Sequence, residues 1–339
     1  IKPPVKCSDN STIYNPNNVS KLMSRKYLID EREENEIIKK LDPTHKFTLP
    51  PSKYCFKIAK EQLPETLKDI KKCRKDMGNK RGKLNSAIIM KDGGVSLDKL
   101  ENLKEIFSSK KLTGKFLYEL RRVFYGITKI NKAGKYHNDI KRQNILIDPK
   151  TFRFNIIDFG LLQDTKYFRG SLKKYFVYPT IKYVMANSEI LYNLFEKNKI
   201  DEIKKRLVDD FKDELVNDKK YLLPEYSISN TIDITYNYLS NVYSRTTTYD
   251  EFFNQIAYNY TNKMDMYALG LVILRLIYYD KNVTYQSLPV YLKELQQLAS
   301  EMINPDGDKQ PLPNVTYKKY IKFVKKHKLY KKKHTRRNQ

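Results

Sequence analysis

Four polar side chains between Asp139 and Asp158 have the types and spacing that phosphoryl transfer requires. Asp139 can accept the proton of an attacking hydroxyl, and Lys141, two residues later on the same side of an extended loop, can steady the transferred phosphate. Asn144 and Asp158 carry an amide and a carboxylate oxygen, which are hard ligands suited to Mg²⁺. The sequence therefore predicts a site where a bound metal and fixed cations assist the transfer of a phosphoryl group.

The elements that must hold these side chains can be predicted from the surrounding pattern. Apolar residues recur at helical spacing after Thr113, which could cap the helix, and Gly134 stands where a helix-ending glycine would. These apolar residues are Leu117, Leu120, Phe124, Ile127 and Ile130. Two short apolar runs follow, residues 145–147 and 152–157, with an Asp-Pro turn between them. We therefore expect a long helix, the polar loop, and then a β-hairpin that ends at the second acidic residue.

The segment His137-Asn138-Asp139-Ile140-Lys141-Arg142-Gln143-Asn144, with Asp158-Phe159-Gly160 beginning 14 residues after Asn144, resembles the catalytic loop and the magnesium loop of protein kinases. The resemblance implies an α+β fold of two lobes, a small β-rich N-lobe and a larger, mostly helical C-lobe. It also implies ATP and Mg²⁺ as cofactors, with Asp139 and Lys141 as catalytic residues and with Asn144 and Asp158 as metal ligands. Lysine two residues after the catalytic aspartate is typical of Ser/Thr kinases, so the implied substrates are serine and threonine hydroxyls of proteins.

Two further segments match the same family. Residues 264–270, Met-Asp-Met-Tyr-Ala-Leu-Gly, resemble the buried helix that follows the activation segment, in which Asp265 would anchor the catalytic loop. Residues 88–97 resemble the hinge between the lobes. There the resemblance places Met90 as the gatekeeper and Asp92 beside the bound nucleotide.

The nucleotide-binding residues of the small lobe follow from the same resemblance. Val19-Ser20-Lys21-Leu22 resembles the strand that bears the nucleotide-binding lysine, with Lys57 as the alternative to Lys21. The carboxylate partner should lie on the helix predicted for residues 29–41. Glu34 fits best, because apolar residues follow it at the +3, +4 and +7 positions, as core positions of that helix would. Three other glutamates remain open as the partner, namely Glu31, Glu33 and Glu36.

The chain departs from the kinase pattern in several places. No glycine precedes Lys21, so the N-lobe should lack its first strand and its Gly-rich phosphate loop, as a chain that begins just after that loop would. Asn138 replaces the usual arginine, which predicts little activation by phosphorylation of the activation loop. The Ala-Pro-Glu signature is reduced to Tyr178-Pro179-Thr180, and residues 185–262 look like a family-specific insertion. The expected domains are the N-lobe at 1–92, the C-lobe at 93–317 and a basic tail at 318–339.

The chain of 339 residues carries 65 Lys and Arg against 39 Asp and Glu, a formal net charge of +26, which favours polyanionic partners. We therefore expect acidic proteins or nucleoproteins among the substrates, and non-specific contact with nucleic acid through the tail at 318–339. A solvated lysine surface produced by biased codon usage accounts for the charge equally well. The most apolar stretch, residues 269–274, is too short to cross a bilayer, so no membrane partner is expected.

Cysteine usage and a narrower resemblance bear on location. The three cysteines, Cys7, Cys55 and Cys73, are an odd number without a CxxC pair, which argues against a disulfide framework or a zinc site and favours a reducing, intracellular compartment. The segments 2–7, 19–24 and 40–43, together with the glycine pair of the hinge, resemble Ser/Thr kinases of giant nucleocytoplasmic DNA viruses. That resemblance implies the host cytoplasm or the virion as the location.

Three functions remain open at this point. The chain could be an active Ser/Thr protein kinase, since all four residues of the chemistry are present. It could be a catalytically weak pseudokinase or a basic virion structural protein on the same fold, which the missing glycine loop and the insertion would suit. It could also serve mainly in nucleic-acid packaging, in which case binding to nucleic acid should fall steeply with salt. Turnover of ATP separates the first function from the second.

Overall fold

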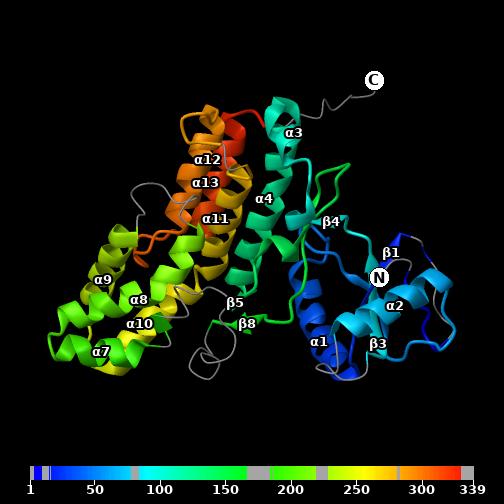
Figure 1. Cartoon of the computed structure of the whole chain (residues 1–339), viewed down its shortest axis with the longest axis horizontal. Coiled ribbons are helices and arrows are strands. Elements are labelled where there is room, and N and C mark those ends of the chain that lie inside the picture. The colour runs from blue at the N-terminus through cyan, green and yellow to red at the C-terminus, as the bar shows by residue number, and fades with distance from the viewer. Residues whose placement is uncertain are drawn as a thin grey trace.

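The computed structural model of the chain combines helices with small antiparallel sheets, so the fold is α+β as expected (Figure 1). The structure describes residues 4–9, 15, 17–77, 84–165, 184–185, 187–218, 228–280 and 283–329. The Tyr178-Pro179-Thr180 match lies outside these residues. The insertion predicted at 185–262 and the tail predicted at 318–339 lie partly outside them.

A three-stranded antiparallel sheet forms the smaller part of the structure. Its strand order is β1 (Asn18–Met23), β3 (Ser86–Lys91) and β2 (Pro51–Cys55). Successive side chains of β3 alternate between the two faces of the sheet. One face packs on the segment around Cys7 and on α2 (Pro64–Met77), and the other packs on α1 (Arg25–Leu41). Because both faces are covered, β3 is apolar on both sides.

The polar loop is held between a long helix and a hairpin, as expected. α4 (Lys110–Lys132) packs its buried face on β7 (Phe154–Ile156), which pairs with β6 (Ile145–Ile147). The Asp148 carboxylate stabilises the turn between these strands by accepting hydrogen bonds from two backbone N–H groups. Phe152, which was predicted to start the second strand, lies in this turn instead with a φ of +59°. Three two-residue strands complete the sheets: β4 (Val95–Ser96) beside β6, and β5 (Lys135–Tyr136) paired with β8 (Gln163–Asp164).

The larger part of the structure is a layer of helices around α4 (Figure 1). It contains α3 (Leu103–Ser108), α11 (Met264–Ile277), α12 (Val290–Met302) and α13 (Pro313–Lys326). α11 is buried on almost every side, as its apolar sequence predicted. α13 packs along α4, where the Tyr320 ring stacks on the Phe124 ring at 4.0 Å between centres. Residues 318–326, the start of the segment predicted as a basic tail, therefore belong to a packed helix.

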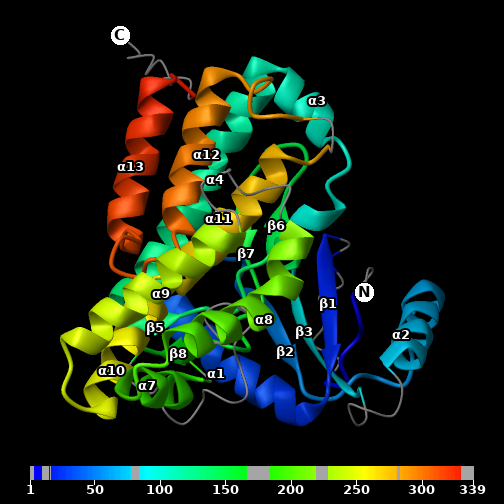
Figure 2. The same cartoon turned by 60° about the vertical axis from the view of Figure 1, so that its left-hand side comes forward.

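The described part of residues 185–262 forms helices at one end of the helical layer (Figure 2). They are α7 (Ser188–Glu196), α8 (Ile200–Asp218), α9 (Ile228–Ser244) and α10 (Tyr249–Thr261). α7 and α8 are separate helices, because α7 ends at Glu196 and Asn198 adopts a φ of +52° before α8 begins at Ile200. Aromatic rings join these helices, since the Tyr192 ring lies 5.4 Å from the Tyr243 ring and 5.5 Å from the Phe252 ring.

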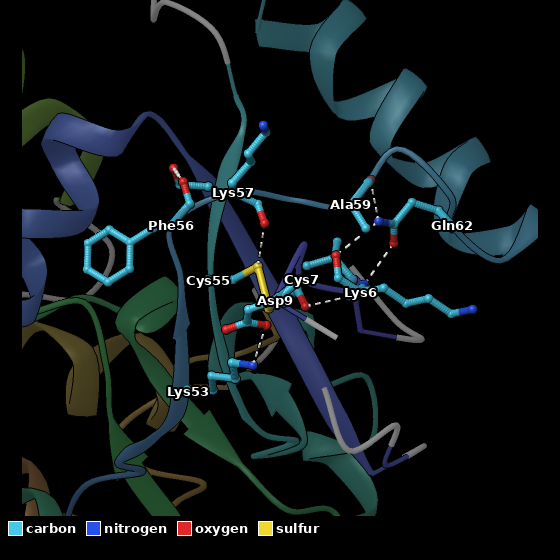
Figure 3. Close-up of a disulfide and its surroundings, with 12 residues drawn as sticks. Lys6, Cys7, Asp9, Lys53, Cys55, Phe56, Lys57, Ala59 and Gln62 are labelled. Carbon is cyan, nitrogen blue, oxygen red and sulfur yellow. Dashed lines mark hydrogen bonds and ion pairs between the residues drawn. A yellow bond between two sulfur atoms is a disulfide. The ribbon is translucent and has the colours of Figure 1, made fainter. Parts of the chain in front are cut away.

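Cys7 and Cys55 form a disulfide, which corrects the expectation that the chain has none (Figure 3). Their Cα atoms are 5.5 Å apart, and both cysteines are buried in one apolar cluster with Ile70 of α2. The two residues are separated by 48 positions, so no spacing rule reveals the pair. Packing of the N-terminal segment against the end of β2 brings them together. The reducing compartment stays a prediction, now without its argument from unpaired cysteines.

Candidate active site

Asp139 lies at the centre of a buried polar cluster. Its Oδ2 accepts hydrogen bonds from Lys141 Nζ at 2.8 Å and from Asn144 Nδ2 at 2.7 Å. The structure thus brings together three of the predicted site residues, as their short separation in the sequence required. Asp139 Oδ1 is buried and accepts no hydrogen bond from any described residue. Buried polar atoms normally have a partner, so this oxygen is placed to accept a hydrogen bond from a bound group.

Asn144 is oriented by the same cluster. Its Nδ2 donates to the backbone oxygen of Asp139 at 2.9 Å as well as to the carboxylate. Because both contacts require a nitrogen donor, the amide cannot be flipped, and its oxygen is the atom left for a cation. The backbone N–H of Ile157 donates to the backbone oxygen of Asn144 at 3.0 Å. This bond holds Asn144 next to the strand end that carries Asp158.

Asp265 anchors the loop that carries Asp139, as the resemblance implied. It lies in the first turn of α11 and is buried. Its Oδ2 accepts a hydrogen bond from the His137 N–H at 2.6 Å, and its Oδ1 accepts one from the Asn138 N–H at 3.0 Å. Burial raises the pKa of Asp265, although the two N–H donors and His137 oppose that rise. Asn138 adopts a φ of +62°, a conformation that asparagine tolerates better than most residues.

His137 ties the loop to the segment that carries Asp158. Its Nδ1 accepts a hydrogen bond from the Asp139 N–H at 3.2 Å, so the proton of a neutral ring must be on Nε2. Nε2 lies 3.1 Å from Ile157 O and donates to it. The ring also packs against Phe159 at 4.9 Å between centres. With both ring nitrogens used, His137 positions the loop and is not available as a catalyst.

Lys21 connects the small sheet to Asp158. Its Nζ donates to Asp158 Oδ1 at 2.9 Å and to both carboxylate oxygens of Glu31 at 2.9 Å. Burial alone would lower the pKa of Lys21, but the two carboxylates outweigh it and raise that pKa. Burial alone would raise the pKa of Asp158, but the charge and the hydrogen bond of Lys21 outweigh burial, so the pKa of Asp158 is lowered. The lysine and the aspartate are therefore both charged at neutral pH. Of the two candidate lysines, the structure places Lys21 at the site.

The carboxylate partner of Lys21 is Glu31, which corrects the prediction of Glu34. The two glutamates are three residues apart on α1 and face the same way, so the apolar residues that follow Glu34 could not separate them. Leu28, which is three residues before Glu31, is fully buried in one cluster with Met23 and Ile88 of the small sheet, so the packing of α1 turns Glu31 toward that sheet. Glu34 Oε2 is buried, accepts no hydrogen bond from a described residue and faces Gly160.

Glu34→Gln should stabilise the protein at high pH and leave its stability unchanged at low pH. Burial, with the negative charges of Glu31 and Asp30, raises the pKa of Glu34 from 4.5 to about 8. The folded state binds this proton more tightly, so stability is lost as pH rises from about 4.5 to about 8. We expect a gain of the order of 1–2 kcal/mol at pH 8.5, since water screens a partly exposed carboxyl.

Urea unfolding at pH 4.5 and pH 8.5 measures this effect. Glu33→Gln removes an exposed carboxyl from the same turn of α1 and is the matched control, with no expected change at either pH. An equal gain for Glu34→Gln at both pH values would contradict the pKa shift.

Met90 and Asp92 lie at the connection between the small sheet and the helices. Met90 is the second-last residue of β3 and packs, half-buried, with the apolar cluster beneath α1. Asp92 Oδ1 accepts a hydrogen bond from the Gly94 N–H at 2.9 Å, which shapes the turn after β3. Gly94 has a φ of +95°, and a Cβ there would lie 2.2 Å from Ile147 O, so only glycine lets this connection approach β6. Both residues therefore lie at the segment predicted as the hinge, Met90 within the strand that pairs with β1 and Asp92 just after it.

Asn144 and Asp158 fit a magnesium ion that is shared with a phosphate ligand. In the part of the chain that the structure describes, no group of three or more His, Cys, Asp and Glu side chains could hold a metal alone. Mg²⁺, however, is commonly held by one or two protein ligands, with phosphate oxygens and water completing its shell. The Asp158 side chain is 42% exposed and has only Oδ1 paired with Lys21, so Oδ2 can reach an ion.

No known protein-family model matches this chain, and no curated protein is significantly similar to it in sequence. Any statement about family, activity or origin therefore depends on the residues of the site and on their arrangement. Among the described helices, none is both long and apolar enough to span a membrane.

Proposed function

We propose that this chain is a Ser/Thr protein kinase that transfers the γ-phosphoryl group of ATP to protein hydroxyls. The observation that carries the proposal is the pairing of Lys21 with both Glu31 and Asp158, beside the Asp139 cluster. A cation from the small sheet is thereby placed next to the carboxylate proposed to hold the metal. The unpaired Asp139 Oδ1 lies in the loop that hydrogen bonds to the same segment.

The arrangement of elements supports two lobes of the kinase type. The small sheet carries Lys21 on β1, and α1 packs on one face of that sheet. One connection, at residues 92–94, leads from β3 to β4 and the helices. The loop with Asp139, the β6–β7 hairpin and Asp158 then follow in the order that the resemblance implies. Asp265 joins α11 to the loop, so the buried helix and the catalytic loop form one rigid unit.

Each residue of the site has a role that its contacts support. Asp139 Oδ1 accepts the proton of the substrate hydroxyl, while Oδ2 is held by Lys141 and Asn144. Lys21 binds phosphate oxygens of the nucleotide, and Glu31 keeps its ammonium group in place. Asn144 Oδ1 and Asp158 Oδ2 would hold Mg²⁺, which when bound neutralises the negative charge that develops on the phosphates. Lys141 is 43% exposed on its side chain and can turn from Asp139 to the transferred phosphate.

Substrate class and location are parts of the same proposal. A net charge of +26 favours acidic proteins or nucleoproteins as substrates. The resemblance to giant-virus kinases supports the host cytoplasm or the virion as the location. The alternative is a protein on the same fold that binds Mg·ATP without turning it over.

The test is transfer of labelled γ-phosphate from ATP, with Mg²⁺, to acidic and basic acceptor proteins by the purified full-length protein. We expect label on serine and threonine only. Glu31→Gln should lower transfer at least tenfold, because Lys21 loses the group that holds it, whereas Glu34→Gln should leave transfer within about twofold at pH 7. The matched pair removes one carboxyl each from neighbouring turns of α1. Nucleotide binding without transfer by any of these proteins would overturn the kinase proposal in favour of the binding protein.

A further inference from the structure

The solvent-facing side of α4 carries cations along its whole length, with two tyrosines among them in the middle of the helix. At intervals of three or four residues it presents Lys111, Lys115, Tyr118, Arg122, Tyr125, Lys129 and Lys132. A helix of 23 residues is about 35 Å long, so this row is long enough for an extended polymer. The buried side of α4 packs on β7 and the hairpin, so the row faces away from the active site.

α13 extends this row sideways. It runs antiparallel to α4, since Thr128 contacts Pro313 and Gly114 lies near Leu329. The Tyr317 ring of α13 lies 5.9 Å from the Tyr125 ring of α4. We call the combined face the α4–α13 surface and define it by Tyr118, Arg121, Tyr125, Lys129, Tyr317, Lys318 and Lys325.

The charge of this surface is not neutralised by its own helices. Together α4 and α13 contain twelve Lys and Arg, seven and five respectively, and one acidic residue, Glu119, which forms ion pairs with both Arg121 and Arg122. On the side of α13 toward α12, Lys319 and Lys326 form ion pairs with glutamates. Lys318 and Lys325 are exposed and form no ion pair with another described residue. Free cations in a row suit a polyanion with regularly spaced phosphates.

The rings of the surface are already stacked with cations. The Arg121 guanidinium lies 4.1 Å from the centre of the Tyr118 ring, and the ammonium groups of Lys46 and Lys129 lie 5.7 and 5.8 Å from the Tyr125 ring. Planar arginine and tyrosine side chains are the groups on which unpaired bases stack. No large apolar side chain of α4 is strongly exposed, and the exposed apolar residues Leu312 and Val315 lie at the start of α13, so the α4 part of this face lacks the anchors that insert into a lipid surface.

We propose that the α4–α13 surface binds single-stranded nucleic acid, with its lysines on the phosphates and with Tyr118 and Arg121 stacking on bases. Neither helix alone shows the surface, because the aromatic residues come mainly from α4 and the unpaired lysines partly from α13. This proposal is independent of the phosphotransferase function, since none of its residues contacts Asp139 or Asp158.

Fluorescence anisotropy of a labelled 20-nucleotide oligothymidine, titrated with the full-length protein at several salt concentrations, tests the proposal. The triple variant Lys129→Glu, Lys318→Glu and Lys325→Glu should bind at least tenfold more weakly. Its salt dependence should be shallower by about 2 in the slope of log K against log salt, for three lost phosphate contacts. The control is Lys68→Glu, Lys71→Glu and Lys72→Glu on α2, an exposed basic helix without aromatic residues. It changes the net charge equally and should bind within about threefold of the wild type.

Stacking is tested separately by Tyr118→Leu, which keeps the bulk and the charge of the surface but removes the ring. Binding should weaken at least fivefold, and duplex DNA of the same length should compete less well than the single strand. Equal losses from the two triple variants would overturn the proposal in favour of general charge attraction. Unchanged binding of the oligothymidine by Tyr118→Leu would overturn the proposal in favour of a surface for any anion. The same conclusion would follow if the wild type bound anionic phosphatidylserine vesicles as tightly as the oligothymidine and the α4–α13 triple variant lost that binding. Circular dichroism melts confirm that each variant is folded.

Discussion

Asp139→Asn should lower the rate of phosphate transfer about a thousandfold, while the protein stays folded and still binds Mg·ATP. Asparagine can keep a hydrogen bond to Lys141 or Asn144 but cannot accept the proton of a hydroxyl, and a positioned base contributes roughly 10²–10⁴ in rate. A thousandfold loss corresponds to about 4 kcal/mol of transition-state stabilisation. Single-turnover transfer of labelled phosphate, with the affinity for nucleotide measured in parallel, separates the chemical step from binding.

The matched control for this prediction is Asp148→Asn. Asp148 caps the turn between β6 and β7 within ten residues of Asp158, but its carboxylate bonds to two backbone N–H groups and to the Thr151 side chain, all within that turn. An asparagine oxygen can accept the same bonds, so we expect activity within about twofold of the wild type. If Asp139→Asn retained more than about a tenth of the wild-type rate, Asp139 would not be the base. That result would favour the alternative, a protein that binds Mg·ATP without turning it over.

Asp265→Ala should lower the free energy of unfolding by about 3 kcal/mol, the largest effect on stability that we expect from a residue outside the site. Two backbone N–H groups, of His137 and Asn138, would lose their acceptor in a buried place, and each such loss costs roughly 1–3 kcal/mol. The cost is reduced because burying the carboxylate itself is unfavourable. Phosphate transfer should also fall at least a hundredfold in protein that remains folded, because the loop loses its anchor.

Asp201→Ala provides the comparison for Asp265→Ala. Asp201 also lies in the first turn of a helix, α8, but is exposed. It contributes its favourable interaction with the helix dipole and a solvent-screened attraction to Lys204, so the expected cost is below about 1 kcal/mol with no change in activity. Urea unfolding of both variants measures the change in the free energy of unfolding, and transfer assays measure the change in activity. Equal costs in the two variants would show that the bonds from Asp265 to the loop do not stabilise the fold.

Local sequence determined the parts of this protein whose residues are neighbours in the chain. Asp139, Lys141 and Asn144 meet because they lie within six consecutive positions, and a loop this short keeps their side chains close together. The α4 helix and the β6–β7 hairpin follow from apolar periodicity and from the Asp-Pro turn, which act over a few residues. Asp265 was predictable only through resemblance, because nothing local shows that it reaches a loop 127 and 128 residues away.

The tertiary structure alone decided the contacts between distant segments. Glu31 rather than Glu34 meets Lys21, because the choice depends on how α1 is rotated against the small sheet and both glutamates fit the helical pattern. The Cys7–Cys55 pair depends on the N-terminal segment docking beside β2. The α4–α13 surface depends on two antiparallel helices that are about 200 residues apart in the sequence, as the bond from Tyr320 to Leu117 shows. In each case the periodicity of one element fixes which face is buried, whereas the partner of that face is chosen by packing energy summed over the whole chain.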